Sequence, residues 1–546
     1  MRVRIAALVL AWLAAATAWP AGPPAGGGAA ATAGPGWARG AVFYEVFVRS
    51  FADSDGDGKG DLAGLTARLD HLRSGRPGSQ EDLGVDAIWL MPIFKSPSYH
   101  GYDTSDYETV NRDYGTNEDF VRLCREAHRR GLRVIVDLVL NHTSWQHPWF
   151  LLSASRNASQ YRDWYVWRTD DPGWTRTWDT VPTWHGLPDQ PGRYYYGIFW
   201  LGMPDLNYRN PAVRAEMKWI AKLWLDRGAD GFRLDAVRHL VETGPGPGQE
   251  DTEETHAWLR EFAAYVRSIR PDAVLVGEAW TRDAGQFARY FGDTARAPGG
   301  DEIPVLFDFG LAEALLEGLR SGDASPIADR LRQNLATLPS GADAAPFLTN
   351  HDTIRVATQL GGDPARLRTA AALLLTLPGS PFIYYGEEIG LRQPNNGDDE
   401  FKRTPMPWDG SPGAGFSSGT PWQRLLKDHE TVNVAAQARD RSSLLWRYRQ
   451  LIRLRHGSEA LRLGDLELLP SSGGLLAFVR RSGRQAVLVV HNLGTAPARA
   501  GPLSLPGRKP VRLFADPGVA PPALGPGGWT IELPPLASGV WKLEAP

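Results

Sequence analysis

Polar and ionisable residues lie at or near the C-terminal ends of four apolar, β-branched stretches of the sequence. They are Asp137, Asn141 and His142 in Arg133–His142, Arg233 and Asp235 in Gly231–Val237, Glu278 in Ala273–Trp280, and His351 and Asp352 in Pro346–Asp352. If the stretches are neighbouring strands, the three carboxylates nearest the strand ends, Asp235, Glu278 and Asp352, meet an arginine and two histidines in one mouth. Side chains of these types transfer protons and attack electrophilic carbon. The pattern predicts a catalytic site, and the alternative is a set of structural ion pairs at the rim of a sheet. Asp137, which lies earlier on its strand, is expected to be structural.

The elements that position these residues alternate along the chain. Eight β-type stretches alternate with helical ones such as Asn117–Arg130, Pro211–Arg227 and Thr252–Arg270; the other four stretches are Val42–Phe51, Val85–Phe94, Val305–Gly310 and Ser380–Ile389. This rhythm predicts an α/β fold, a (β/α)8 TIM barrel. In such barrels the active site forms at the carboxyl ends of the strands, where the polar residues stand.

Two regions break the rhythm. The stretch between His142 and about Asn210 is rich in Trp, Tyr and Pro, and it is too long for a structureless loop, so we expect an inserted domain over 143–208. After the helical stretch Ser442–His456, short alternating segments separated by Gly/Pro turns predict a C-terminal β-sandwich over 457–546. The barrel then comprises residues 41–142 and 209–456.

The N-terminus is typical of an export signal. Arg2 and Arg4 precede an apolar run, Ile5–Leu13, and the small residues Ala16–Ala18 follow it, so residues 1–18 are predicted to be a signal peptide. The alternative is an uncleaved anchor. Residues 19–40, rich in Gly, Pro and Ala, are expected to form a disordered leader. These features predict export to the periplasm or the medium.

The composition limits the classes of partner that the protein can bind. A net charge of −3 gives no sign of the strongly basic surface that binds nucleic acid. After signal cleavage no membrane-spanning segment is expected. The 21 tryptophans include side chains that can pack in the core or stack on sugar rings. Cys124 is the single cysteine, so no intrachain disulfide forms, and its helical setting favours a buried thiol. Nothing argues against a monomer.

The four polar strand ends, in this order and spacing, resemble the α-amylase family of glycoside hydrolases, and Met203–Asn207 resembles a fifth signature of that family. The resemblance implies that Asp235 is the nucleophile, Glu278 the acid/base and Asp352 the third carboxylate. Retaining hydrolysis of a glycosidic bond needs such a nucleophile and such an acid/base. Arg233 lies on the same side of its strand as Asp235 and is expected to keep it ionised, whereas Glu278 needs an apolar setting. His142 and His351 would donate hydrogen bonds to the sugar.

The stretch Tyr99–Asp103 resembles the part of the family that frames the sugar on the non-reducing side. Tyr102 would be a stacking platform, and His100 or Asp103 would bind hydroxyls. In the α-glucosidase and oligo-1,6-glucosidase branch, an aspartate here pairs with a late arginine and closes the pocket. Arg403, in a stretch that resembles that branch's motif except for Pro407, is the expected partner of Asp103.

Other residues resemble true α-amylases. Arg238 and His239 resemble a basic residue–histidine pair that binds the leaving-group side, and Met203 departs from the oligo-1,6-glucosidase form. The leading hypothesis is therefore hydrolysis of α-1,4-glucosidic bonds in starch or malto-oligosaccharides. An exo-acting α-glucosidase or oligo-1,6-glucosidase, transfer to a sugar acceptor, and a non-catalytic carbohydrate-binding relative remain as alternatives.

A Gly-rich loop carries carboxylates on alternate residues, namely Asp53, Asp55, Asp57 and Asp61, with Lys59 among them. Hard Ca²⁺ is bound by oxygen ligands in this manner. Gly64 replaces the bidentate Glu that ends a calcium-sensor loop, so we expect a structural Ca²⁺ site, the alternative being a hydrated acidic turn. The resemblance adds the Lys59 carbonyl as a ligand. It also leaves open a second Ca²⁺ site that would use Asn141, Asp205 and the His239 carbonyl.

Overall fold

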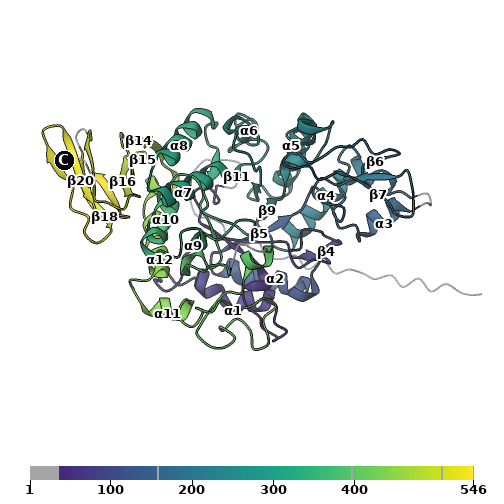
Figure 1. Ribbon diagram of the computed structural model, residues 1–546, viewed down its shortest axis with the longest axis horizontal. Coiled ribbons are helices and arrows are strands. Elements are labelled where there is room, and N and C mark those ends of the chain that lie inside the picture. The colour runs from purple at the N-terminus through teal and green to yellow at the C-terminus, as the bar shows by residue number, and fades with distance from the viewer. Residues whose placement is uncertain (1–35, 156–158, 395–397, 506–507, 545–546) are drawn as a thin grey trace, which may run out of the picture. The chain divides into compact units, whose positions relative to one another are not determined.

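The computed structural model describes residues 36–155, 159–394, 398–505 and 508–544. Its centre is a parallel eight-stranded sheet in the order β12-β11-β10-β9-β5-β2-β1-β13 (Figure 1). The strands are β1 (Phe43–Val46), β2 (Ala87–Leu90), β5 (Arg133–Leu138), β9 (Gly231–Leu234), β10 (Val274–Gly277), β11 (Val305–Phe307), β12 (Asp343–Ala345) and β13 (Phe382–Tyr384). A parallel bridge between Phe347 and Phe382 joins the two ends of this order. The chain therefore has the expected (β/α)8 barrel.

Helices connect the strands and are fixed by local sequence signals. The main ones are α1 (Leu62–Leu72), α2 (Asn117–Arg129), α4 (Pro211–Asp226), α5 (Glu253–Ile269), α7 (Phe309–Ser321), α8 (Ser325–Thr337), α10 (Pro364–Thr376) and α12 (Leu444–His456). Thr116 and Asp119 form a capping box at the start of α2, and Asn210 caps α4 ahead of Pro211. Such caps satisfy the free N–H groups of a first turn, which explains why these helices begin where the sequence predicts.

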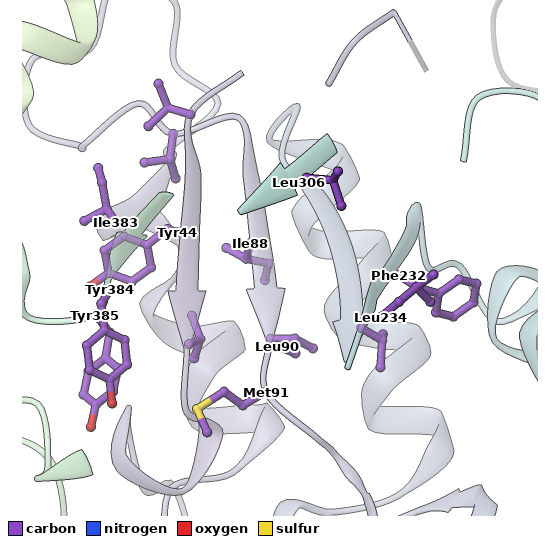
Figure 2. Close-up of a cluster of buried hydrophobic side chains, with 14 of the residues drawn as sticks. Tyr44, Ile88, Leu90, Met91, Phe232, Leu234, Leu306, Ile383, Tyr384 and Tyr385 are labelled. Atoms are coloured by element: carbon purple, nitrogen blue, oxygen red, sulfur yellow. The ribbon is translucent and has the colours of Figure 1, made fainter. Parts of the chain in front are cut away.

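Alternate residues of each strand enter two different cores. Phe43, Trp89 and Phe307 point into the barrel and form a compact inner cluster with their counterparts on other strands. Tyr44 and Ile88 belong to the outer cluster between strands and helices, part of which Figure 2 shows. Because side chains alternate across a strand, an almost continuously apolar strand supplies both layers at once.

The inserted domain is a small aromatic unit with its own sheet. It contains α3 (Pro148–Ala154), the short helix η3 (Arg162–Trp164) and an antiparallel sheet of β6 (Trp167–Arg168), β8 (Tyr194–Tyr196) and β7 (Trp184–Gly186). Buried Trp184, Tyr196 and Ile198 form its core. Its elements therefore fall within the predicted range 143–208.

The C-terminal region folds into two antiparallel sheets, drawn in yellow in Figure 1. One has the order β14-β15-β16-β21-β18 and the other β17-β20-β19. The strands are β14 (Asp465–Leu468), β15 (Leu475–Ser482), β16 (Gln485–Asn492), β17 (Ala498–Leu503), β18 (Lys509–Ala515), β19 (Ala523–Gly525), β20 (Gly528–Leu533) and β21 (Ser538–Glu544). A short helix, α13 (Glu459–Leu463), precedes them. Buried Arg447 of α12 binds Asp516 at 2.7 and 2.9 Å, which anchors the sheets to the barrel.

Two boundaries differ from expectation. The seventh strand ends at Ala345, before the predicted Pro346–Asp352 stretch; Pro346 has no N–H to pair, and within that stretch only Phe347 forms a β-bridge, with Phe382. The predicted leader is too long: residues 36–40 form turns, Ala38 is buried, and the Trp37 indole donates to the Asp272 carbonyl at 2.8 Å. The predicted signal peptide and the rest of the leader lie outside the described residues. No helix in the described ranges is long and apolar enough to cross a membrane.

Candidate active site

One buried guanidinium gathers the carboxylates at the barrel mouth. Arg233, on β9, is 1% exposed, and its Nη1 donates to Asp235 at 2.7 Å while its Nη2 lies 2.7 Å from Glu278 Oε2. The same Nη1 lies 2.9 Å from both oxygens of Asp137, on β5. Arg233 and Asp235 face the same way because they are two residues apart in extended chain, as the sequence predicts. The arrangement fixes a predicted nucleophile and a predicted acid on one cation.

Burial sets the protonation of these two carboxyl groups. It raises the pKa of Glu278 to about 7, with Asp235 and Asp352 adding to the shift and Arg233 opposing it. Burial also raises the pKa of Asp235 to about 6, a rise that the sequence does not predict. Arg233 does oppose the shift, but the buried setting and the charge of Asp137 outweigh it. The order is still the one that acid catalysis by Glu278 requires, with Asp235 ionising first.

The third carboxylate lies between two cations. Asp352 keeps 34% of its side-chain surface exposed, and its oxygens lie 3.1 Å from His351 Nε2 and 3.2 Å from Arg403 Nη2. These cations outweigh burial and lower the pKa of Asp352 well below its usual range. His351 Nδ1 also lies 2.6 Å from Glu45 of β1. Although burial alone would lower it, Asp352 and Glu45 raise the pKa of His351 to about 9. Asp352 is therefore a fixed negative charge, suited to stabilising a cationic transition state.

Beneath these groups lies a layer that positions them. The Tyr102 hydroxyl lies 2.6 Å from His351 Nε2 and 3.2 Å from Asp137, and its ring stacks on that of His351. The Trp89 indole donates to Asp137 at 3.2 Å, and Arg233 lies over its ring. Asp137 is fully buried and touches only positioning groups, in agreement with its predicted structural role.

The residue after Asp235 has an unusual backbone. Ala236 has φ 48°, in the left-handed region, and its N–H donates to Glu278 Oε2 at 3.1 Å. Non-glycine residues pay a conformational penalty there and are found at sites where the strain serves a purpose. The turn carries the chain sharply away from Asp235 and points a backbone donor at Glu278.

The donor side of the mouth differs from expectation. Arg403 binds Asp352 and donates to the Tyr99 hydroxyl at 3.1 Å, whereas Asp103 accepts hydrogen bonds from the hydroxyls of Ser96, at 2.7 Å, and Ser98. The predicted Asp103–Arg403 pair is therefore not formed, because each member has another partner. His100 lies beside this wall; burial lowers its pKa, and its Nδ1 accepts the Tyr102 N–H at 3.1 Å.

The acceptor side is a cavity of about 620 Å³ that opens beside Glu278. Its lining comes from the inserted domain and from the segments after β9 and β10, and includes Arg176, Thr177, Trp178, Phe199, Ala236, Arg238, His239, Glu250 and Trp280. His239 is buried against the rings of Trp178 and Phe199, and burial lowers its pKa to about 4. Arg238 is held by Asp251 at 2.6 Å and by the Trp280 carbonyl at 2.7 Å.

Three buried polar atoms lack a partner at the junction of β5 and the inserted domain. They are His142 Nε2, Asn141 Oδ1 and Asp205 Oδ2. Burial lowers the pKa of His142 to about 3, so it is a neutral ring with a nitrogen available to a sugar hydroxyl. Burial raises the pKa of Asp205, and the Asn141 side chain beside it opposes that shift. Two orphaned oxygens at one buried place are the donor type that Ca²⁺ binds.

Only some of the carboxylates of the predicted calcium loop come together. Asp53, Asp55 and Asp61 each offer a carboxylate oxygen, all within 4.8 Å of one another. Asp57 lies outside this group, and its Oδ1 accepts the Lys59 N–H at 2.8 Å. The Lys59 ammonium pairs with Asp113 at 3.0 Å. The oxygen set suits Ca²⁺, although Asp61 also caps α1 through the Gly64 N–H.

Several functional residues escaped sequence reasoning. Glu45, Trp178, Phe199, Gln249 and Trp280 hold or line the site, yet none was singled out. The aromatic richness of the insertion was a signal for Trp178 and Phe199, but the sequence did not indicate which rings face the cavity. Glu45 gave no signal, because its partner His351 lies 306 residues away.

Comparison with known proteins agrees with this geometry. A family model described as the α-amylase catalytic domain matches residues 45–464. The protein named alpha-amylase 3 of Dictyoglomus thermophilum is 38% identical over 462 residues, which cover 84% of this chain and 85% of that protein. A trehalose synthase of Pimelobacter is 37% identical, over 90% of this chain and 93% of its own. The crystal structure of the α-amylase from H. orenii superposes with a TM-score of 0.82 at 38% identity, covering 92% of this chain and 99% of that one.

Proposed function

Because the chain belongs to the α-amylase family of glycoside hydrolases and transglucosylases, we propose that it is a retaining hydrolase of α-1,4-glucosidic bonds in starch and malto-oligosaccharides. The observation that carries this proposal is the placement of Asp235 and Glu278 on the two terminal nitrogens of Arg233, with burial raising the pKa of Glu278. A nucleophile held beside an acid whose pKa is raised is what the double displacement needs.

In the first step, the Asp235 carboxylate attacks the anomeric carbon while Glu278 donates its proton to the departing glycosidic oxygen. In the second, Glu278 takes a proton from water, the water oxygen bonds to the anomeric carbon, and Asp235 leaves. Asp352, held ionised by His351 and Arg403, stabilises the cationic sugar in both transition states. His142 offers its free nitrogen to a hydroxyl of that sugar.

Preference for chains over small exo-substrates rests on two features. The residues that would close the donor pocket, Asp103 and Arg403, bind other partners, so that side lacks the pair that favours exo-action. On the other side of Glu278, the 620 Å³ cavity offers room and aromatic surface for further glucose units. Both features favour cleavage within a malto-oligosaccharide.

A second candidate is glucosyl transfer to a sugar acceptor. A covalent glycosyl-enzyme can be intercepted by a hydroxyl in place of water, and the cavity beside Glu278 is lined by the rings of Trp178, Phe199 and Trp280. The 37% identity to a protein named trehalose synthase favours the same candidate. An exo-acting α-glucosidase or oligo-1,6-glucosidase is the remaining alternative.

Time-resolved product analysis separates these activities. Soluble starch, maltose and isomaltose are digested in parallel. A rapid fall in iodine staining with mixed oligosaccharides is the expected result. Glucose from maltose or isomaltose, with starch hardly shortened, would identify an exo-enzyme, and trehalose or another isomeric disaccharide from maltose would identify a transferase.

We also propose that Asp53, Asp55 and Asp61 hold a structural Ca²⁺, and that Asn141 and Asp205 contribute to a second one. Support comes from the three carboxylates within 4.8 Å and from the two orphaned buried oxygens. Bound Ca²⁺ would supply charge neutralisation and rigidity at these loops and take no part in the chemical step.

Export is proposed from the N-terminal sequence, in which Arg2 and Arg4 precede the apolar run Ile5–Leu13 and Ala16–Ala18. N-terminal sequencing of the protein recovered from the periplasm or medium tests this. A mature chain that starts near residue 19 is expected. Recovery of the intact Met1 terminus from the cytoplasm would contradict it.

A further inference from the structure

Two tryptophans lie exposed beside each other at the edge of the inserted domain. Trp145 follows the strand-end residue His142, and Trp200 lies in the turn after β8; each is 43% exposed. Their ring centroids are 6.3 Å apart and their planes are inclined by 46°. Large aromatic side chains are normally placed away from water, and a cluster of them at a surface marks a binding site more often than a single exposed ring does.

The pair is held in place by the backbone of one turn. The Trp145 N–H donates to the Gly202 carbonyl at 2.9 Å, and the Met203 N–H donates to the Trp200 carbonyl at 2.9 Å. A β-carbon added at Gly202 would lie 2.2 Å from the six-membered ring of Trp200, so this indole rests directly on the glycine. The Tyr195 hydroxyl also donates to the Leu201 carbonyl at 2.6 Å. The Trp200 ring and the backbone of both residues are therefore fixed before any ligand arrives.

The pair also continues the acceptor side of the site. Phe199, the residue before Trp200, lines the cavity beside Glu278. Its ring lies 5.2 Å from that of His142, three residues before Trp145. The two exposed tryptophans thus extend two segments whose neighbouring residues already face the reacting bond.

We propose that Trp145 and Trp200 form a binding platform for a segment of an α-glucan chain whose scissile bond lies at Glu278. The proposal rests on the glucan substrate proposed above. Glucose rings present apolar C–H faces between polar hydroxyl edges, and an exposed indole matches them with an apolar face and one N–H donor. Two inclined rings suit consecutive units of a curved α-1,4 chain.

A protein partner suits this patch less well. The two half-exposed indoles have only Leu201, 42% exposed, as a large apolar neighbour along the turn. A stable protein interface buries about 800 Å² on each side, well above what three partly exposed side chains supply. The patch has the size of a few sugar rings.

The test compares long and short substrates in the double variant Trp145→Ala/Trp200→Ala. We expect KM for soluble starch to rise about 5–10-fold, with kcat and the kcat/KM for maltotriose unchanged, because only a long chain reaches the platform. Gly202→Ala, which displaces Trp200 without removing it, should give a smaller change of the same kind. Trp219→Ala is the matched control, since Trp219 is 42% exposed on α4 and outside the cavity lining.

Native electrophoresis through gels that contain amylopectin gives a readout free of turnover. Wild type and Trp219→Ala should be retarded, and the double variant should migrate faster than either. Equal losses on maltotriose and starch, or unchanged retardation of the double variant, would overturn the platform. A wild-type dimer on gel filtration that becomes monomeric in the double variant would also overturn it, in favour of self-association. If the chain does not hydrolyse starch, the proposed function fails, but the gel still decides whether the platform binds glucan.

Discussion

The floor of the barrel mouth and the acceptor cavity are built in different ways. The floor consists of charged side chains on β1, β5 and β9 and in the segments that follow β9, β10 and β12, and these side chains pair with one another. A single residue, Arg233, contacts the three carboxylates Asp137, Asp235 and Glu278. The acceptor cavity is formed by loops and by the inserted domain. Its lining includes the rings of Trp178, Phe199 and Trp280 together with polar side chains, among them Arg238 and Glu250, which lie 3.2 Å apart.

The difference separates chemistry from selectivity. A buried network of charges tolerates few substitutions, because removing one member leaves the others unpaired. An aromatic wall contributes contact area and shape, and one ring can be lost at a modest cost. We therefore expect substitutions of the reacting carboxylates on the floor to cause the largest losses of turnover, and substitutions at the cavity to change which chains are cut or transferred.

The largest effect is expected from Asp235→Asn. Without a nucleophile the glycosyl-enzyme cannot form, so kcat on maltoheptaose should fall at least about 1,000-fold. Asp103→Asn is the control, because that carboxylate lies at the same mouth but is bound by Ser96 and Ser98, and its loss should cost less than about tenfold. Trp178→Ala, at the cavity, should cost only a few-fold. Retention of activity by Asp235→Asn would contradict the assignment of the nucleophile.

The floor should also set the pH profile. Asp235 must be ionised and Glu278 protonated, so kcat/KM should rise through a pKa of about 6 and fall through one of about 7. The charge of Asp137 raises the pKa of Asp235, so Asp137→Asn should move the acid limb to lower pH. Asp137 and Glu278 also interact, since the charge of Glu278 raises the pKa of Asp137, so the alkaline limb should move in the same direction but less than the acid limb. Glu250→Gln, in the cavity, should move neither limb, and an acid limb unchanged in Asp137→Asn would refute the coupling.

At the cavity, Gln249 is the residue to change. This fully buried side chain donates to the Thr175 carbonyl at 2.8 Å and accepts from the Tyr196 hydroxyl at 3.0 Å. The backbone carbonyl of Gln249 lies 3.1 Å from His239 Nδ1. Gln249→Ala should raise KM for maltoheptaose about 3–10-fold and lower the ratio of transfer to hydrolysis, with little change in kcat.

Gln190→Ala provides the control for general loosening of the inserted domain. Gln190 donates to the Ala154 carbonyl at 2.8 Å and is outside the cavity lining. If both variants change KM equally, Gln249 has no specific positioning role. If Gln249→Ala lowers kcat without changing KM, the cavity contributes to the chemical step, as the floor does, and not to substrate selection.

The smallest effect on activity is expected from calcium removal. It should act through the wall that Tyr99 and Arg403 form on the donor side of the site. The Trp422 N–H donates to the Gly58 carbonyl of the acidic loop at 2.8 Å, the Trp422 ring stacks on Tyr99, and Tyr99 accepts from Arg403. Chelation should lower Tm by about 5 °C and reduce kcat/KM alike for short and long chains, with Ca²⁺ restoring both.

Two variants separate the metal from the helix cap. Asp53→Ala should reduce the response of Tm to a chelator to the part that is due to the second site at Asn141 and Asp205. Asp283→Ala removes a similar aspartate cap, from α6 (Ala284–Arg289), and should leave that response intact. A wild-type Tm that is insensitive to chelation would remove the calcium proposal.

The sequence predicted the floor better than the cavity for a physical reason. Arg233, Asp235 and Glu278 lie at or just after the end of a strand whose apolar pattern is local, and parallel barrel strands bring such ends together. The pairing of Asp103 with Arg403 was wrongly expected because Ser96 and Ser98 compete for the same carboxylate. The rise in the pKa of Asp235 was missed because desolvation depends on the whole fold, whereas the nearby arginine is visible in the sequence.

By itself, the sequence predicted the barrel, the inserted and C-terminal regions, and the candidate carboxylates Asp235, Glu278 and Asp352, because strand patterns and motif residues are encoded over short distances. Only the tertiary structure decided that His351 binds Glu45, that Arg403 binds Asp352, and which aromatic rings line the cavity. Those features depend on contacts between segments tens to hundreds of residues apart. The energies of such contacts depend on distance and burial, which the order of residues along the chain does not display.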